Sequence, residues 1–222
     1  MEESSPAPTA RPAPKPAARR RQQQFEDKRK TILDAALRLF SQKGVHGASV
    51  DQIAALADVS KGNLLYYFES KEVLYRSVLR QLLTVWLEPL RTFSAMQDPA
   101  EAIGTYIRRK LESSRDNPQA SRLFCLELVQ GAPLFGEELS LELRDLVDRK
   151  AEVIRAWIAD GTLSAVEPHH LIFTLWSVTQ HYADFSVQVE ALTGRTLADP
   201  AFFEETVENV RQIVLSGVLP RA

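Results

Sequence analysis

Residues 49–71 read SVDQIAALADVSKGNLLYYFESK, a pattern that predicts two short helices joined by a tight turn. Ser49 followed three residues later by Gln52 forms a capping box, which marks the start of the first helix. The turn falls at Asp58-Val59-Ser60, and its serine hydroxyl can cap a second helix over residues 61–67. Because a helix of about two turns is unstable alone, its neighbours must hold it in place. This arrangement predicts a helix-turn-helix, which inserts the start of its second helix into the major groove of DNA.

The same spacing also fits an ordinary helical hairpin within a bundle. The identities of the residues are therefore needed to distinguish a helix-turn-helix from such a hairpin. Three segments within residues 32–71 are informative: Ala36 to Val50, Ile53 to Ser60 and Leu65 to Lys71. They resemble the opening, middle and closing motifs of the DNA-binding domain in the TetR family of bacterial transcription regulators. One departure is Asp58, where that family usually has Gly, and Asp tolerates turn conformations better than most residues. The resemblance implies a three-helix DNA-binding head in front of a divergent helical body.

The candidate DNA contacts lie on the second helix and around its start. Lys61 can bind guanine or a phosphate, and Asn63 can read adenine. Gly62 between them has no side chain, so it lets the helix approach the bases closely. Four further residues are placed to bind phosphates, which position a head without reading sequence: Ser49, Gln52, Tyr67 and Lys71. Tyr66 and Tyr67 could instead pack in the core, whereas the resemblance implies that one of them touches a phosphate.

Composition separates the chain into a basic front and an acidic rear. Residues 1–80 hold 14 Lys and Arg against 9 Asp and Glu, whereas residues 81–222 hold 13 against 20. A head that binds phosphates, carried on an acidic body, fits this split. The single cysteine, Cys125, excludes a disulfide within the chain and fits the reducing cytoplasm of a bacterium. With no signal peptide and no apolar run of about 20 residues, we expect a cytoplasmic protein without a membrane segment.

Beyond the first 24 residues, the whole chain reads as helical. Residues 1–24 hold five prolines, and we expect a disordered basic arm that reaches a minor groove or only aids solubility. Prolines, glycines and caps divide the rest into helices at 25–43, 49–56, 60–67, 71–94, 99–116, 119–130, 135–160, 168–192 and 200–218. The predicted fold class is all-α. A DNA-binding domain is expected over 25–71, and a ligand-binding and dimerisation domain over 72–222.

The body carries one group of residues typical of a ligand site. Pro89 removes a hydrogen bond from the helix predicted over 71–94 and frees the Val85 carbonyl next to Trp86. On a later helix, one face holds Phe173, Trp176, Gln180 and Asp184. A glutamine on an aromatic face must be paired, and its amide complements a planar ring with adjacent N–H and C=O groups, on which tryptophans can stack. The alternative is that Gln180 bonds a neighbouring helix and the tryptophans are ordinary core.

Five segments of the body also resemble the pyrimidine-utilisation regulators of the TetR family, which respond to uracil and thymine. They are residues 78–90, 106–128, 131–135, 170–185 and 206–210. The resemblance implies a uracil or thymine site built around Trp86, Trp176 and Gln180, to which the local arguments add Pro89 and Phe173. A narrower alternative keeps the DNA-binding role but replaces the ligand with a purine or another catabolite.

Together these patterns predict a repressor that releases a palindromic DNA operator when a pyrimidine binds. A stripe over Phe203, Val207, Val210 and Val214, with Ile213 beside it, is either internal core or, by the resemblance, part of a homodimer interface. No catalytic, metal or cofactor motif is recognisable, because His169-His170 and His181-x-x-Asp184 lack further ligands. The competing classes are an enzyme and a scaffold that binds only protein. Salt-dependent DNA binding would exclude the scaffold, and the absence of pyrimidine turnover would exclude the enzyme.

Overall fold

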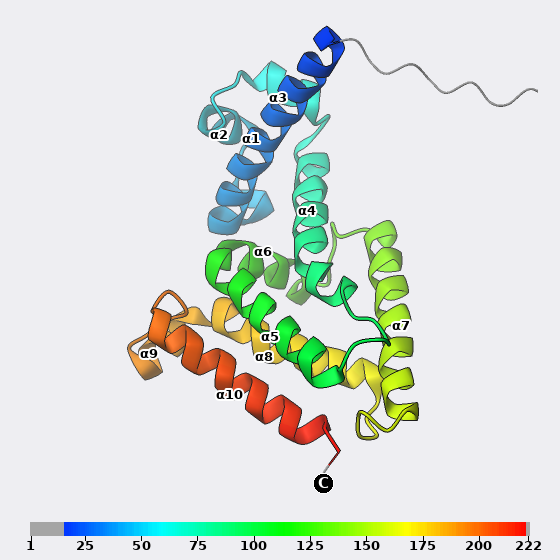
Figure 1. Cartoon of the computed structure of the whole chain (residues 1–222). Helices are drawn as coiled ribbons and strands as arrows, with labels where there is room; N and C mark the ends of the chain where they lie inside the picture. Colours follow the sequence, from blue (N-terminus) through cyan, green and yellow to red (C-terminus); the bar gives the residue numbers. More distant parts are fainter. Residues whose placement is uncertain (1–15, 221–222) are drawn as a thin grey trace, which may run out of the picture.

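The computed structural model describes residues 16–220, without the side chains of residues 16–18 and 137–139. All regular structure in this part of the chain is helical, which confirms the all-α fold. The ten helices are α1 (Pro16–Gly47), α2 (Val50–Leu56), α3 (Lys61–Tyr67), α4 (Lys71–Arg91), α5 (Pro99–Asp116), α6 (Pro118–Val129), α7 (Glu137–Ala159), α8 (Pro168–Asp184), α9 (Ser186–Thr193) and α10 (Pro200–Val218) within residues 16–220. Figure 1 shows α1 to α3 as a head at one end of α4, with the other helices forming a body at its far end.

Side-chain caps start several helices where the sequence predicts them. The Ser49 and Gln52 capping box is formed at the start of α2, and the Ser60 hydroxyl accepts a hydrogen bond from the Asn63 N–H at the start of α3. In the body the caps are followed by a proline in the first turn, at Asp98, Glu167 and Asp199. Each of these pairs fixes a helix start, because the cap satisfies a free N–H and proline lacks one.

The disordered arm expected over residues 1–24 is wrong for residues 16–24, which belong to α1. Hydrogen bonds one turn apart support this added helix, since Gln22 donates to Glu26 and Gln23 donates to Asp27. Such pairs stabilise even an exposed helix, by a few tenths of a kcal/mol each. The remainder of the expected arm, residues 1–15, lies outside the described residues.

Two helix ends in the body also differ from expectation. The single helix expected over 168–192 is two helices, because the backbone leaves the helical region at Phe185 (φ −113°, ψ 32°). α4 ends at Arg91, which places Pro89 in its last turn. The Lys150 ammonium of α7 donates to the carbonyls of Arg91 and Phe93, so it caps this end of α4.

α4 is shared between the core of the head and the core of the body. The core of the head is formed by buried side chains at Ile32, Ala35, Ala36, Leu39, Phe40, Ile53, Ala57, Leu64 and Phe68. Leu65, next to Leu64 on α3, is 37% exposed and lies outside this core. From α4, Tyr75 packs edge-on against Phe40 at 5.0 Å between ring centroids. Further along the same helix, Trp86 is buried in the body.

A buried carboxylate ties α4 to α6 at the boundary of head and body. Glu127, at the end of α6, is 2% exposed. It accepts a hydrogen bond from the Tyr75 hydroxyl at 3.0 Å and another from the Leu134 N–H at 2.7 Å. Burial, together with the Glu127 charge, raises the pKa of Tyr75, so its hydroxyl stays a donor. Both carboxylate oxygens are therefore used to join α4, α6 and the connection that follows α6.

We expect Glu127→Ala to lower the free energy of unfolding by about 3 kcal/mol, because it leaves two buried donors without an acceptor. Tyr75→Phe should cost about 1.5 kcal/mol, since Glu127 keeps its bond to Leu134. Urea denaturation of both variants measures the difference. An equal or smaller loss for Glu127→Ala would show that the carboxylate does not hold this junction together.

Candidate functional site

The start of α3 is fully open to solvent, while its other side holds the helix in the head. Lys61, Gly62 and Asn63 are exposed, and the next residue, Leu64, is completely buried. A Cβ added to Gly62 would meet no heavy atom within 4 Å. The fold therefore does not require glycine at this position. If glycine is required at position 62, the reason must be the close approach of a bound molecule.

Two lysines predicted to contact DNA already have partners within the head. The Lys61 ammonium lies 2.9 Å from the Asp51 carboxylate, and both side chains are more than half exposed. Such a surface ion pair contributes little, so it can be exchanged for a phosphate or a base. The Lys71 ammonium donates to the Ala48 carbonyl at 3.2 Å and so joins the start of α4 to the segment before α2.

The two tyrosines at the end of α3 form an aromatic group with Phe25 of α1. The ring centroid of Phe25 lies 4.7 Å from that of Tyr67 and 6.3 Å from that of Tyr66. Tyr66 is 75% exposed, so it is not a core residue. Ser49 and Gln52 are exposed as well, although each caps the other. All eight predicted DNA contacts thus lie in one region of the head, around α3 and the start of α2.

In the body, α5 inserts a buried lysine between the two helices that carry the predicted ligand residues. The Lys110 ammonium lies 3.9 Å from the ring centroid of Trp86 on α4. Lys110 is only 2% exposed and donates no hydrogen bond to any described residue. Burial lowers its pKa to about 7, an effect that the charge of Asp184 on α8 partly opposes.

Asp184 connects this lysine to α6. Its carboxylate accepts hydrogen bonds from the Ser121 hydroxyl and from the Cys125 thiol. Burial nevertheless raises the pKa of Asp184 above its usual range, with these two hydrogen bonds and Lys110 acting in the opposite direction. Cys125 is half-buried and takes part in this polar group.

A second buried polar group lies one turn from Lys110 on α5. The Tyr106 hydroxyl is buried and has no hydrogen bond of good geometry to a described residue. Burial raises its pKa, and the neighbouring Trp176 indole lowers it slightly. Gln180 follows Trp176 by one turn on α8 and precedes Asp184 by one turn, so it belongs to the same strip. We call the group formed by Trp86, Tyr106, Lys110, Trp176, Gln180 and Asp184 the polar cluster.

Pro89 and Phe173 lie at the margins of the polar cluster. Pro89 lines an outer cleft of about 480 Å³ between α4 and α5, together with Val85. Phe173 is 50% exposed, with its ring centroid 5.9 Å from that of Trp176. Lys110 and Tyr106 are not among the ligand residues predicted from the sequence. A signal was present, because Lys110 and Ser114 interrupt the apolar stripe that runs along α5.

Comparison with known proteins places the chain in a family. Residues 32–78 match the model of the bacterial regulatory proteins of the tetR family, and residues 79–221 match the C-terminal region of YcdC-like proteins. The chain is 57% identical over 194 residues to the HTH-type transcriptional regulator RutR of Escherichia coli strain K12, covering 87% of this chain and 92% of that protein. The chain belongs to the TetR family. It is a DNA-binding bacterial transcription regulator and not an enzyme.

Two further similar proteins are a second RutR protein and a solved structure that shares the fold alone. RutR of Shigella flexneri matches to the same extent as its Escherichia coli counterpart, at 57% identity. A putative transcriptional regulator of Streptomyces coelicolor, SCO4942, superposes with a TM-score of 0.69 at 23% identity, covering 88% of this chain and 99% of that one. Within residues 16–220, every helix is too short or too polar to span a lipid bilayer.

Lys110→Met should make the protein more stable at neutral pH, and the gain should shrink as the pH rises. The folded pKa of about 7 lies below the ordinary value of lysine, so between these two values the unfolded state binds more protons and wild-type stability increases with pH. Urea denaturation at about pH 6 and about pH 9 measures the convergence of the two proteins. Lys43→Met, on an exposed part of α1, is the control. Parallel stability curves for wild type and Lys110→Met would contradict the assignment of a buried, titrating amine.

Proposed function

We propose that this regulator is a homodimeric repressor that binds a palindromic operator and releases it when uracil or thymine occupies the polar cluster. The observation that carries the proposal is the buried Lys110 ammonium on the face of Trp86, with no hydrogen-bond acceptor among the described residues. A buried ammonium without an acceptor is costly unless a ligand supplies one. The 57% identity to RutR extends through the body, where the cluster lies, and supports carrying over the ligand class.

A pyrimidine base has the chemistry that the polar cluster lacks. Its carbonyl oxygens would accept from Lys110, and its ring N–H groups would donate to the Gln180 amide oxygen or to Asp184. Trp86 and Trp176 would stack on the ring once Lys110 leaves the face of Trp86. Pro89 and Phe173 would border the site without bonding the base. A base with a different pattern of donors would leave some of these groups unpaired, which gives the site its selectivity.

For the head, we propose that the start of α3 reads bases and the residues around it bind phosphates. Lys61 would exchange Asp51 for DNA, Asn63 would read a base edge, and Gly62 would permit the close approach of the helix. The phosphate contacts would come from Ser49, Gln52, Tyr66, Tyr67 and Lys71. Two such heads related by a two-fold axis require a palindromic operator.

The proposed dimer interface is the open face of α8 and α10. All four residues of the predicted stripe are buried within the single chain: Phe203, Val207, Val210 and Val214. Beside the stripe lies a groove of about 390 Å³, lined by Ser177, Val178, His181, Tyr182, Val210, Ile213 and Val214. Ile213 is 71% exposed beside it. Packing this face against the same face of a second copy would bury Ile213 and form a four-helix interface.

Gly62→Ala should separate folding from DNA binding. Alanine in the exposed start of α3 should raise stability by about 0.5 kcal/mol, because its Cβ meets nothing and glycine disfavours helix. Operator affinity should fall by about ten-fold or more, because the added methyl holds α3 away from the bases. Fluorescence anisotropy with operator DNA measures this affinity, and urea denaturation measures the stability. Operator binding by Gly62→Ala equal to that of the wild type would remove Gly62 from the reading surface.

Uracil and thymine should weaken operator binding, whereas a purine should not. Trp86→Ala and Gln180→Ala should lose this response and keep operator affinity, because they alter the polar cluster and leave the head intact. Gln188→Ala on the exposed side of α9 controls for the loss of an amide. Titration of the DNA complex with each base, using DNA from upstream of the gene, measures the release. Release by a purine would replace the proposed ligand class, and wild-type release from both cluster variants would refute the site.

A further inference from the structure

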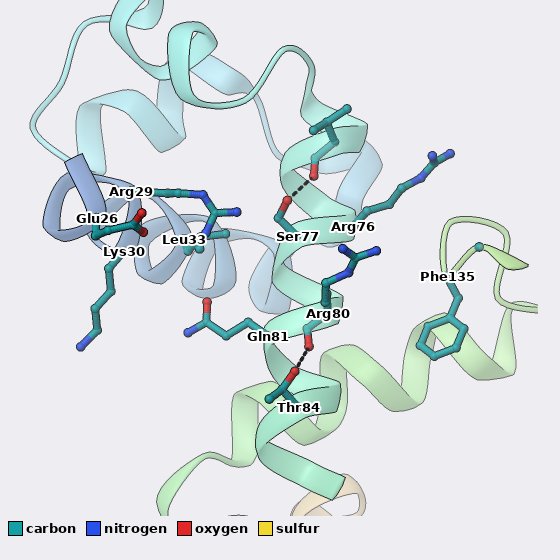
Figure 2. Close-up of a pocket in the computed structure, with 12 residues that line it drawn as sticks. Glu26, Arg29, Lys30, Leu33, Arg76, Ser77, Arg80, Gln81, Thr84 and Phe135 are labelled. Atoms are coloured by element: carbon teal, nitrogen blue, oxygen red, sulfur yellow. Dashed lines mark hydrogen bonds between the residues drawn. The ribbon is translucent and has the colours of Figure 1, made fainter. Parts of the chain in front are cut away.

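A cleft of about 730 Å³ lies between α1 of the head and α4, away from the polar cluster. The connection between α6 and α7 closes one side with Phe135 and Gly136. The remaining lining comes from Glu26, Arg29, Lys30 and Leu33 on α1 and from Val73, Arg76, Ser77, Arg80, Gln81 and Thr84 on α4. Figure 2 shows that Arg29 extends from α1 toward α4 and that the ring of Phe135 faces α4 across the cleft.

The lining of this cleft is strongly basic. Three basic side chains, Arg29, Lys30 and Arg76, line the cleft with Glu26, whose carboxylate already accepts a hydrogen bond from Gln22. Arg80 is a further basic lining residue and has a partner of its own. Arg29, Lys30 and Arg76 form no ion pair with any acidic side chain among the described residues. Several positive charges around one cleft repel one another and create a local potential that attracts anions.

Ion pairing elsewhere in the body makes this cleft unusual. Arginines outside it commonly lie against a carboxylate, as in the pairs Arg91–Glu142, Arg108–Glu204, Arg115–Asp116, Arg149–Asp145, Arg155–Glu152, Arg195–Glu205 and Arg211–Glu208. The body as a whole is acidic, so carboxylates to neutralise a basic group are plentiful. Glu72 lies one turn before Arg76, close enough for the Arg76 charge to lower the pKa of Glu72, but the two side chains form no ion pair. Among the described residues, Arg29 and Arg76 therefore keep a positive charge that a ligand can bind.

The cleft also offers an apolar wall and a fixed guanidinium. Val73, which is 39% exposed, supplies nonpolar surface next to the charges, and the largely buried Leu33 and Phe135 add a smaller part. The Arg29 guanidinium is held over the Phe68 ring, 5.1 Å from its centroid, so part of its conformational freedom is already lost before any ligand binds. A volume of about 730 Å³ is larger than an inorganic anion needs and falls within the range of sites for small organic molecules.

We propose that this cleft binds a small organic phosphate, such as a nucleoside monophosphate, through Arg29, Lys30 and Arg76. The planar guanidinium donates two parallel hydrogen bonds to a phosphate, which makes arginine the side chain best suited to this group. The organic part would lie against Leu33 and Phe135. A polycarboxylate shares the negative charge but lacks the tetrahedral arrangement of oxygens.

The position of the cleft gives the bound anion a consequence for DNA binding. Arg29 lies on the head and Arg76 on α4, so a phosphate held by both fixes the angle at which the head meets α4. Tyr75, which precedes Arg76, is the residue that bonds Glu127 at the same junction. An anion that binds more tightly at one head angle than at another changes the operator affinity. The change cannot exceed the ratio of the anion affinities for the two angles, and the operator changes the anion affinity by the same factor.

Isothermal titration calorimetry of the full chain with adenosine monophosphate, inorganic pyrophosphate and citrate tests the proposal. The nucleotide should bind one site per chain with a Kd on the order of 100 µM, more tightly than the other two, and saturating uracil should leave this site available. Arg76→Glu should weaken nucleotide binding by about ten-fold or more, since an exposed cation becomes an anion within the site. Arg144→Glu, the same charge change on the exposed surface of α7, should leave it unchanged.

Three outcomes would overturn the proposal. The first is no heat of binding for the nucleotide up to about 5 mM, where a site of this kind would be saturated. The second is equal weakening in Arg76→Glu and Arg144→Glu, which would reflect net charge alone. The third is that Arg76→Glu loses operator affinity by as large a factor as it loses nucleotide affinity. The cleft would then be part of the DNA-binding surface. Lys30→Glu, on an exposed residue of α1, provides a second variant if Arg76→Glu does not fold.

Discussion

The structure depends on one helix serving two cores. α4 places Tyr75 against Phe40 in the head and Trp86 against Lys110 in the body, so neither core is complete without it. A helix of 21 residues that packs in both cores can carry a rotation from one end to the other. The buried Tyr75–Glu127 hydrogen bond fixes where this helix lies against α6. Any state with a different tilt of α4 must keep that bond and move α6, or break it and leave buried polar groups unpaired.

This constraint gives α6 a role in the proposed switch. One part of α6 carries Ser121 and Cys125, which bond Asp184 in the polar cluster, and its last turn carries Glu127. A ligand that takes over Asp184 would change the hydrogen bonds of Ser121 and Cys125, while Tyr75 of α4 is bonded to Glu127 on the same helix. α6 thus joins the polar cluster to the head end of α4. The part of the protein that changes between two arrangements would be the pair α4 and α6 rather than a single hinge residue.

The sequence specified the head more completely than the pocket, for a physical reason. Caps such as Ser49 and Ser60 and turns next to proline act over three or four residues, so they can be read locally. The helix break at Phe185 carries no proline or glycine, and the helix over residues 16–24 lies in a stretch whose composition suggests disorder. Trp86 and Gln180 stood out as polar or aromatic anomalies within helices. The sequence did not show that Lys110 joins them, because Lys110 lies on a different helix, α5. Only the tertiary packing shows that the Lys110 ammonium lies on the Trp86 ring.

The same lysine sets the energetics that a small neutral ligand can exploit. A hydrogen bond from a charged donor contributes about 1.5 to 3 kcal/mol, which corresponds to roughly 10- to 100-fold in a binding constant. Moving an equilibrium from 1:99 to 99:1 requires a preference of about 10⁴-fold for one state. Two pockets in a homodimer multiply their preferences, so one such bond per pocket approaches this value. The condition is that the bond forms at only one tilt of α4, because a ligand bound equally in both states shifts nothing. Under the proposed function, Lys110 would meet that condition by displacement. Its ammonium lies on the face of Trp86, so a base could stack there only at a tilt of α4 that gives Lys110 room to leave.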